Sequence, residues 1–64
     1  MPMSLKALRI NANLTRPQVV EATKIPENTL ANYENFTTKV PIDRAIQLAE
    51  FYGCSVDDIR WTEE

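Results

Sequence analysis

Apolar residues along the chain recur at the spacing of helices, with almost no alternation of the kind that strands require. Ser4 can cap a first helix, in which the apolar residues at positions 5, 8 and 12 fall on one face. We expect this helix to end at Asn13, because Asn readily replaces Gly in the left-handed conformation that closes a helix.

A proline separates the second predicted helix from the third. Thr15 and Gln18 form a capping box that begins the second helix, with a proline in its first turn. This helix should stop near Lys24, because the residue before Pro26 is biased away from helical backbone angles. Pro26 then opens a third helix, from residue 27 to about residue 35.

The third predicted helix has two unlike faces. Leu30 and Tyr33 point inward, with Glu34 beside them. The other face is polar, carries small amide side chains, and consists of Glu27, Asn28, Ala31, Asn32 and Asn35. Such a face is available to a partner.

Two more helices complete the predicted fold. The fourth begins at residue 41 or 42 and ends at Tyr52, with Gly53 as its C-cap. Its expected buried residues are Ile42, Ala45, Ile46 and Ala49. Ser55 and Asp58 begin a last short helix containing the apolar residues at positions 56, 59 and 61. We therefore expect an all-α, compact five-helix fold that forms a single domain over residues 1–64.

The composition argues against several classes of function. The 64 residues include no His and one Cys, which leaves almost no ligand set for a metal and no internal disulfide. Most nucleophile and general-base arrangements are missing as well, so we expect no enzyme, no metal and no cofactor. No segment resembles a signal peptide or approaches the ~20 apolar residues that span a bilayer, so a soluble, cytoplasmic protein with no membrane partner is expected.

A net charge of -2 is unfavourable for a nucleic-acid partner, but the charge is unevenly distributed along the chain. Residues 1–26 hold four basic side chains and one acidic one, a net +3, whereas residues 27–50 carry -2 and residues 51–64 carry -3. This distribution excludes a general DNA-coating protein but is compatible with a selective one.

Two short helices joined by a turn, the second with an amide-rich face, match the plan of a helix-turn-helix. The major groove admits one α-helix, and an Asn amide can present a donor and an acceptor together to adenine. Asn28 and Asn32 are four residues apart and share a face on which Thr29 could also read bases, while Glu27 could accept a hydrogen bond from cytosine N4.

The segment 14–35, LTRPQVVEATKIPENTLANYEN, resembles the Cro/CI-type (XRE family) helix-turn-helix of small phage and mobile-element repressors. The flanking segment 48–59, LAEFYGCSVDDI, resembles the same family. The resemblance implies a lambda-repressor-like DNA-binding domain, with the helix-turn-helix formed by the second and third helices and the third helix in the major groove.

The resemblance also assigns roles to individual residues. The implied base-reading residues are Glu27, Asn28, Thr29 and Asn32. The implied phosphate contacts are Thr15, Arg16, Asn35, Thr37, Thr38 and Lys39. Arg9 and Glu34 match an ion pair that bridges the first and third helices.

The sequence departs from the family pattern at several positions. Lys24 stands where Gly is common in the turn, Val20 replaces an Ala between the two helices, and Phe36 replaces a Gly after the third. The third helix also contains no Arg or Lys, so the commonest contact to guanine is missing.

The function that these patterns favour is a sequence-specific DNA-binding transcriptional regulator, a repressor that occupies an operator. The aromatic and apolar residues near the C-terminus suggest a homodimer interface at Cys54, Val56, Ile59 and Trp61, which would match a palindromic double-stranded DNA operator. The alternative is a protein-interaction module with a protein partner, such as an antirepressor or antitoxin-like subunit of the same fold.

Overall fold

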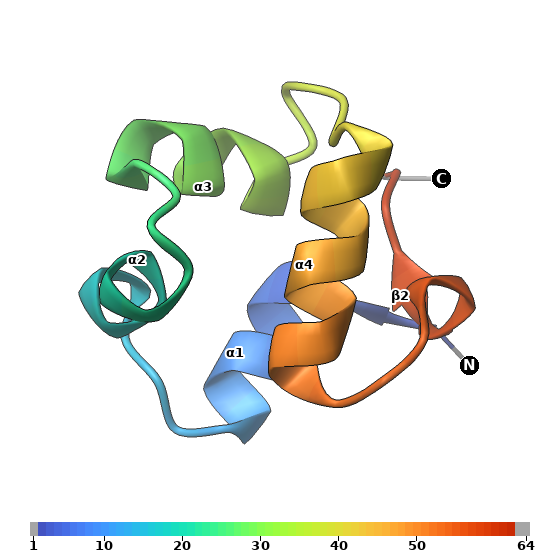
Figure 1. The fold of residues 1–64 in the computed structure, drawn as a ribbon, viewed down its shortest axis with the longest axis horizontal. Helices are drawn as coiled ribbons and strands as arrows, with labels where there is room; N and C mark the ends of the chain where they lie inside the picture. Colours follow the sequence, from blue (N-terminus) through green and yellow to red (C-terminus); the bar gives the residue numbers. More distant parts are fainter. Residues whose placement is uncertain (1, 63–64) are drawn as a thin grey trace.

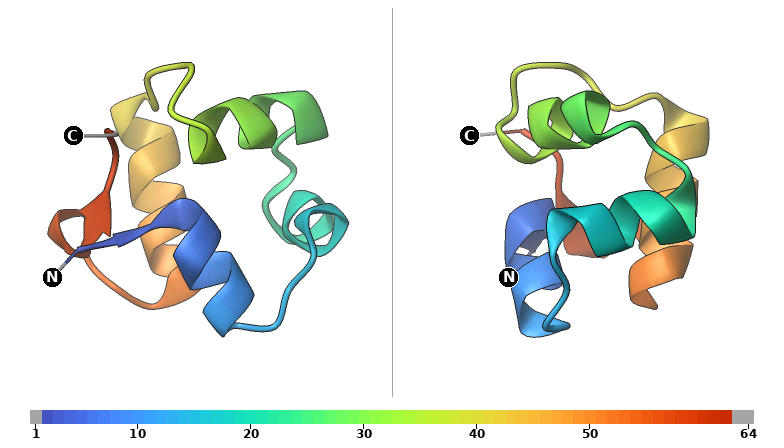
Figure 2. Two further views of the ribbon diagram at one scale, coloured as in Figure 1. Left: turned by 180° about the vertical axis from the view of Figure 1, so that it is seen from behind. Right: turned by 90° about the vertical axis from the view of Figure 1, so that its left-hand side faces the viewer.

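The computed structural model describes residues 2–62 and contains four α-helices over that range. They are α1 (Leu5–Asn11), α2 (Arg16–Thr23), α3 (Glu27–Glu34) and α4 (Ile42–Tyr52). Figure 1 shows α2 and α3 at one side of the molecule and β2 (Ile59–Arg60) at the other, with α4 between them. Both further views in Figure 2 keep α3 at the upper edge, above α1 and α2.

Local capping explains where the helices begin and end. The Ser4 hydroxyl accepts a hydrogen bond from the Ala7 amide at 3.1 Å, which caps α1. At α2 the capping box is complete. The backbone N–H of Gln18 donates to Thr15 Oγ1, and the backbone N–H of Thr15 donates to the side-chain oxygen Gln18 Oε1 at 2.7 Å. Gly53 ends α4 in the left-handed conformation. The predicted ends of these helices are confirmed to within two residues.

The last part of the chain differs from the predicted fifth helix. It forms one turn of 3-10 helix, η1 (Val56–Asp58), in which the Asp58 carboxylate accepts hydrogen bonds from the Ser55 amide and hydroxyl at 3.2 and 3.0 Å. The next two residues form β2, which pairs in parallel with β1 (Met3–Ser4). Strand pairing takes the backbone groups that a longer helix would need, so the prediction of five α-helices was wrong although the helical class holds.

The core lies between the helices and the short sheet. It consists of Leu5, Val19, Ile25, Leu30, Tyr33, Leu48, Ala49 and Ile59. The burial predicted for Ala45 and Ala49 is confirmed, but Ile42 is 69% exposed and Ile46 is 45% exposed. These two isoleucines project from the flank of α4, because Ala45, Leu48 and Ala49 form the stripe that faces the core.

Candidate nucleic-acid interface

The turn between α2 and α3 is held by buried contacts. Lys24 adopts the left-handed conformation, and the following Ile25 is fully buried. The Thr23 hydroxyl donates to the Val19 carbonyl at 2.7 Å, and the Gln47 side chain of α4 donates to the Thr23 carbonyl at 2.8 Å. The turn therefore fixes the direction in which α3 leaves α2.

One face of α3 is buried and the other is open. Leu30, Tyr33 and Glu34 are buried, whereas Ala31 is partly covered. We call Glu27, Asn28, Thr29 and Asn32 the reading face; all are exposed except Thr29, which is half-buried. The structure thus brings the four predicted base-reading residues together on the outer side of one helix.

The buried side of α3 is joined to α1 by the expected ion pair. Arg9 Nε lies 2.8 Å from Glu34 Oε2, and Arg9 Nη2 lies 3.2 Å from Glu34 Oε1. A third hydrogen bond runs from Arg9 Nη1 to the Leu14 carbonyl. The Glu34 carboxylate raises the pKa of Arg9 above its ordinary value, chiefly through the hydrogen bond between the two side chains. This pair fixes α1 and α3 in one register.

Arg16 also approaches the Glu34 carboxylate, with Nε 3.7 Å from Oε1. Nothing in the spacing of residues 16 and 34 indicates this contact. Two guanidinium groups therefore share one carboxylate, which leaves an excess positive charge where α2 begins and α3 ends. Arg16 Nε is buried with no hydrogen-bond partner among the described residues, although about a third of the side chain remains exposed.

Tyr52 of α4 lies near this charged junction. Its hydroxyl is buried and makes no hydrogen bond within residues 2–62. Burial, with a smaller contribution from the Glu34 charge, raises the pKa of Tyr52 to about 12. The hydroxyl therefore stays protonated over the physiological range.

The loop after α3 begins with a Schellman motif. Phe36 has a positive φ of 62°, and its amide donates to the Tyr33 carbonyl while the Thr37 amide donates to the Asn32 carbonyl at 3.0 Å. The guanidinium of Arg60 lies 5.5 Å from the centre of the Phe36 ring, a cation–π contact between this loop and β2.

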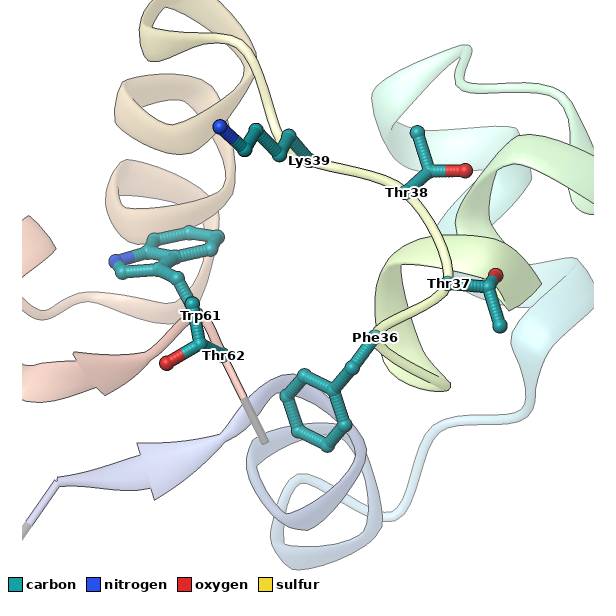
Figure 3. A pocket seen from close by; sticks show the side chains of 6 residues that line it. All are labelled: Phe36, Thr37, Thr38, Lys39, Trp61 and Thr62. Carbon is teal, nitrogen blue, oxygen red and sulfur yellow. The ribbon is translucent and has the colours of Figure 1, made fainter. Parts of the chain in front are cut away.

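Figure 3 shows an open recess of about 180 Å³ between this loop and the C-terminal segment. Its lining residues are Phe36, Thr37, Thr38, Lys39, Trp61 and Thr62.

The predicted phosphate contacts form two groups. Thr15 and Arg16 are at the start of α2, and the approach of Arg16 to Glu34 places that point beside the end of α3, where Asn35 follows. Residues 37–39 form the exposed loop beyond it. Thr37 is more constrained than expected, because its hydroxyl lies 3.2 Å from the Asn32 carbonyl and 3.1 Å from Asn32 Oδ1.

The predicted dimer interface needs a correction at Ile59. This residue is 4% exposed, because it packs into the protein's own core. Cys54, Val56 and Trp61 are partly buried against the same core, and Trp61 Nε1 donates to the Val56 carbonyl at 2.9 Å. Burial raises the pKa of the Cys54 thiol. The most exposed large apolar side chains lie elsewhere, with Ile42 and Ile46 among them.

Between residues 2 and 62, no group of His, Cys, Asp and Glu could hold a metal ion. No helix in that range is long and apolar enough to cross a bilayer.

The comparisons with known proteins agree with this geometry. Residues 4–59 match the family model of a helix-turn-helix domain. No match was found among curated proteins or among solved structures. Because the matched segment covers most of the chain, this protein belongs to the helix-turn-helix domain family and is a DNA-binding protein of the XRE-like type.

Proposed function

We propose that this protein is a sequence-specific transcriptional regulator, and a repressor, that inserts α3 into the major groove of an operator. The observation that carries the proposal is the division of α3, whose reading face is open while Leu30, Tyr33 and Glu34 hold the opposite face in the core. A helix held in this way can enter the groove without rearranging the protein.

The chemistry of the reading face suits direct readout. Asn28 can offer an N–H donor and a carbonyl acceptor to a base edge, Asn32 can offer an N–H donor, and Glu27 can accept a hydrogen bond from cytosine N4. Since α3 carries no Arg or Lys, the bidentate guanine contact is absent from this face. Base preference would therefore depend on short polar side chains.

The charge distribution supports the same orientation. Arg16 provides the excess positive charge near the end of α3, and Lys39 is exposed in the loop that follows. Asp57 and Asp58 belong to η1, which lies beyond α4 from α2 and α3 (Figure 1). A repressor oriented in this way makes few phosphate contacts and keeps its acidic end away from the DNA.

We also propose that the operator is palindromic and is bound in the cytoplasm by a homodimer. Successive major-groove turns on one side of B-DNA are ~34 Å apart, and the longest dimension of the domain is 26 Å. One copy is therefore too short to reach both turns, whereas two copies side by side can place one α3 on each. Ile42 and Ile46, one turn apart on the open flank of α4, are two of the exposed apolar side chains available to such a contact. Sedimentation of Ile46→Glu beside the natural protein tests this, and an unchanged mass distribution would remove this flank from the interface.

Selection of bound sequences from a random duplex pool tests the function directly. We expect an enriched motif, and we expect Asn28→Ala and Asn32→Ala each to weaken binding and relax one base position by about 5- to 150-fold, the range for a good base contact. Asn11→Ala is the matched control, because Asn11 is an exposed amide on α1, away from the reading face. A pool without an enriched motif would instead favour the protein-interaction function.

A further inference from the structure

The side chain of Asn32, at the centre of the reading face, is not free. The Thr37 hydroxyl lies 3.1 Å from Asn32 Oδ1, and no other hydrogen bond to that side chain occurs within residues 2–62. Thr37 comes from the loop after α3 rather than from the helix itself. A residue outside the helix therefore contacts a candidate base-reading group.

The backbone brings these two side chains together. Phe36, with its positive φ, turns the chain back over the last turn of α3. The Thr37 amide then donates to the Asn32 carbonyl at 3.0 Å, which completes the Schellman motif. The Thr37 hydroxyl lies 3.2 Å from the same carbonyl and 3.1 Å from Asn32 Oδ1, but the backbone motif is complete without it. The hydroxyl is exposed and has water as an alternative partner.

The contact restricts what Asn32 presents to DNA. An Asn amide carries a carbonyl on one side and an NH₂ group on the other, and a half-turn about its last bond exchanges them. With Oδ1 next to the Thr37 hydroxyl, the NH₂ group faces away from the loop. An amide with no partner would populate both orientations and would read donor and acceptor edges with less discrimination.

We propose that Thr37 is a specificity-determining positioning residue, whose hydroxyl fixes the Asn32 amide with its NH₂ group toward the base edge. This inference rests on the proposed function, since it concerns the same reading face. It identifies the base under Asn32 as one that offers an acceptor in the major groove, such as N7 or O6 of a purine.

The test compares Thr37→Val, which removes the hydroxyl at nearly constant shape, with Thr62→Val near the end of the described chain. Thr62 is also exposed and has no assigned contact to DNA, so it controls for the loss of a surface hydroxyl. Each variant is put through duplex selection and then titrated against the selected operator and its single-base variants. We expect Thr37→Val to lose about three- to tenfold in discrimination at one base position, the size of one hydrogen bond. Thr62→Val and Thr37→Ser should keep the natural preference.

The Asn32→Ala background separates this role from a general effect on the loop. There the Thr37→Val substitution should change discrimination no further, because the amide that it positions is gone. Equal denaturant midpoints for Thr37→Val and Thr62→Val would show that stability is not the cause.

Two outcomes overturn the inference in different ways. If the natural protein selects a motif and Thr37→Val keeps the full preference at every position, the inference fails and the proposed function stands. If the natural protein selects no motif, the proposed function fails and the inference fails with it.

Discussion

The buried side and the exposed side of α3 are stabilised by different chemistry, although they belong to one eight-residue helix. The buried side packs Leu30 and Tyr33 into the core and joins Glu34 to two arginines. The exposed side has Asn32 tied to Thr37 by a solvent-accessible hydrogen bond. The same helix therefore separates side chains that stabilise the fold from side chains that are open to a partner, so substitutions on its two sides should have different readouts.

The largest expected effect comes from breaking the buried side at Arg9. Arg9→Ala leaves Glu34 without its closest partner, and loss of one member of a buried ion pair costs about 3–5 kcal/mol. Chemical denaturation monitored by circular dichroism measures this loss. Lys6→Ala, an exposed cation on the same helix, is the control and should change the free energy of unfolding by less than about 0.5 kcal/mol.

Arg9→Lys keeps the charge without the two-pronged geometry and should lie between the natural protein and Arg9→Ala. It also keeps the prediction testable if the alanine variant does not fold. An unchanged denaturation midpoint in both variants would mean that the ion pair does not stabilise the fold.

Effects of intermediate size are expected at the turns before and after α3. Lys24 and Phe36 both have positive φ, which costs a residue with a side chain about 1 kcal/mol. Lys24→Gly should therefore raise the free energy of unfolding by about 1 kcal/mol. Phe36→Gly should gain less, because it also loses the Arg60 contact, worth about 0.5–1 kcal/mol. Urea titrations measure both changes. An equal increase in the free energy of unfolding for Lys24→Gly and Phe36→Gly would mean that the Phe36 ring does not stabilise the fold.

The smallest effect is expected at Tyr52, at the edge of the buried charges. Its hydroxyl is buried without a partner, so Tyr52→Phe should leave stability at pH 7 within about 0.5 kcal/mol of the natural protein or slightly above it.

The raised pKa of Tyr52 makes the stability of the protein depend on pH in the alkaline range. The folded state binds the phenolic proton more tightly than the unfolded state, with a pKa of about 12 against 10.0. Stability contributed by the neutral phenol is thus complete below pH 10 and is lost as the pH rises toward 12. Denaturation midpoints of the natural protein should fall faster than those of Tyr52→Phe in that window. Parallel curves would contradict the shifted pKa.

The parts of the fold that could be predicted are those determined by local chemistry. Ser4, Thr15 and Gly53 act within a few residues of themselves, so the helix ends follow from the sequence. The exposure of Ile42 and Ile46 could not be predicted, because helical periodicity defines a broad stripe without showing where its edges meet other elements. The β1–β2 pairing is too short to produce any alternating pattern.

The candidate site shows the same division. The polar face of α3 follows from spacing alone, and the Arg9–Glu34 pair was implied by family resemblance. The Arg16–Glu34 approach and the Thr37–Asn32 contact depend on how distant turns place short polar atoms. The Thr37–Asn32 contact requires a positive φ at Phe36. A bulky residue such as Phe rarely adopts this conformation, so the sequence does not predict it.

The pairing of Met3 with Ile59 has a consequence for the order of folding. Contacts within and between neighbouring helices join residues close in the chain, so they form at small entropic cost, whereas this pairing closes nearly the whole chain into a ring. We therefore expect the two-stranded sheet to form late in folding and to open early in unfolding. Because Ile59 belongs to the core, we expect its side chain to be among the last to be buried.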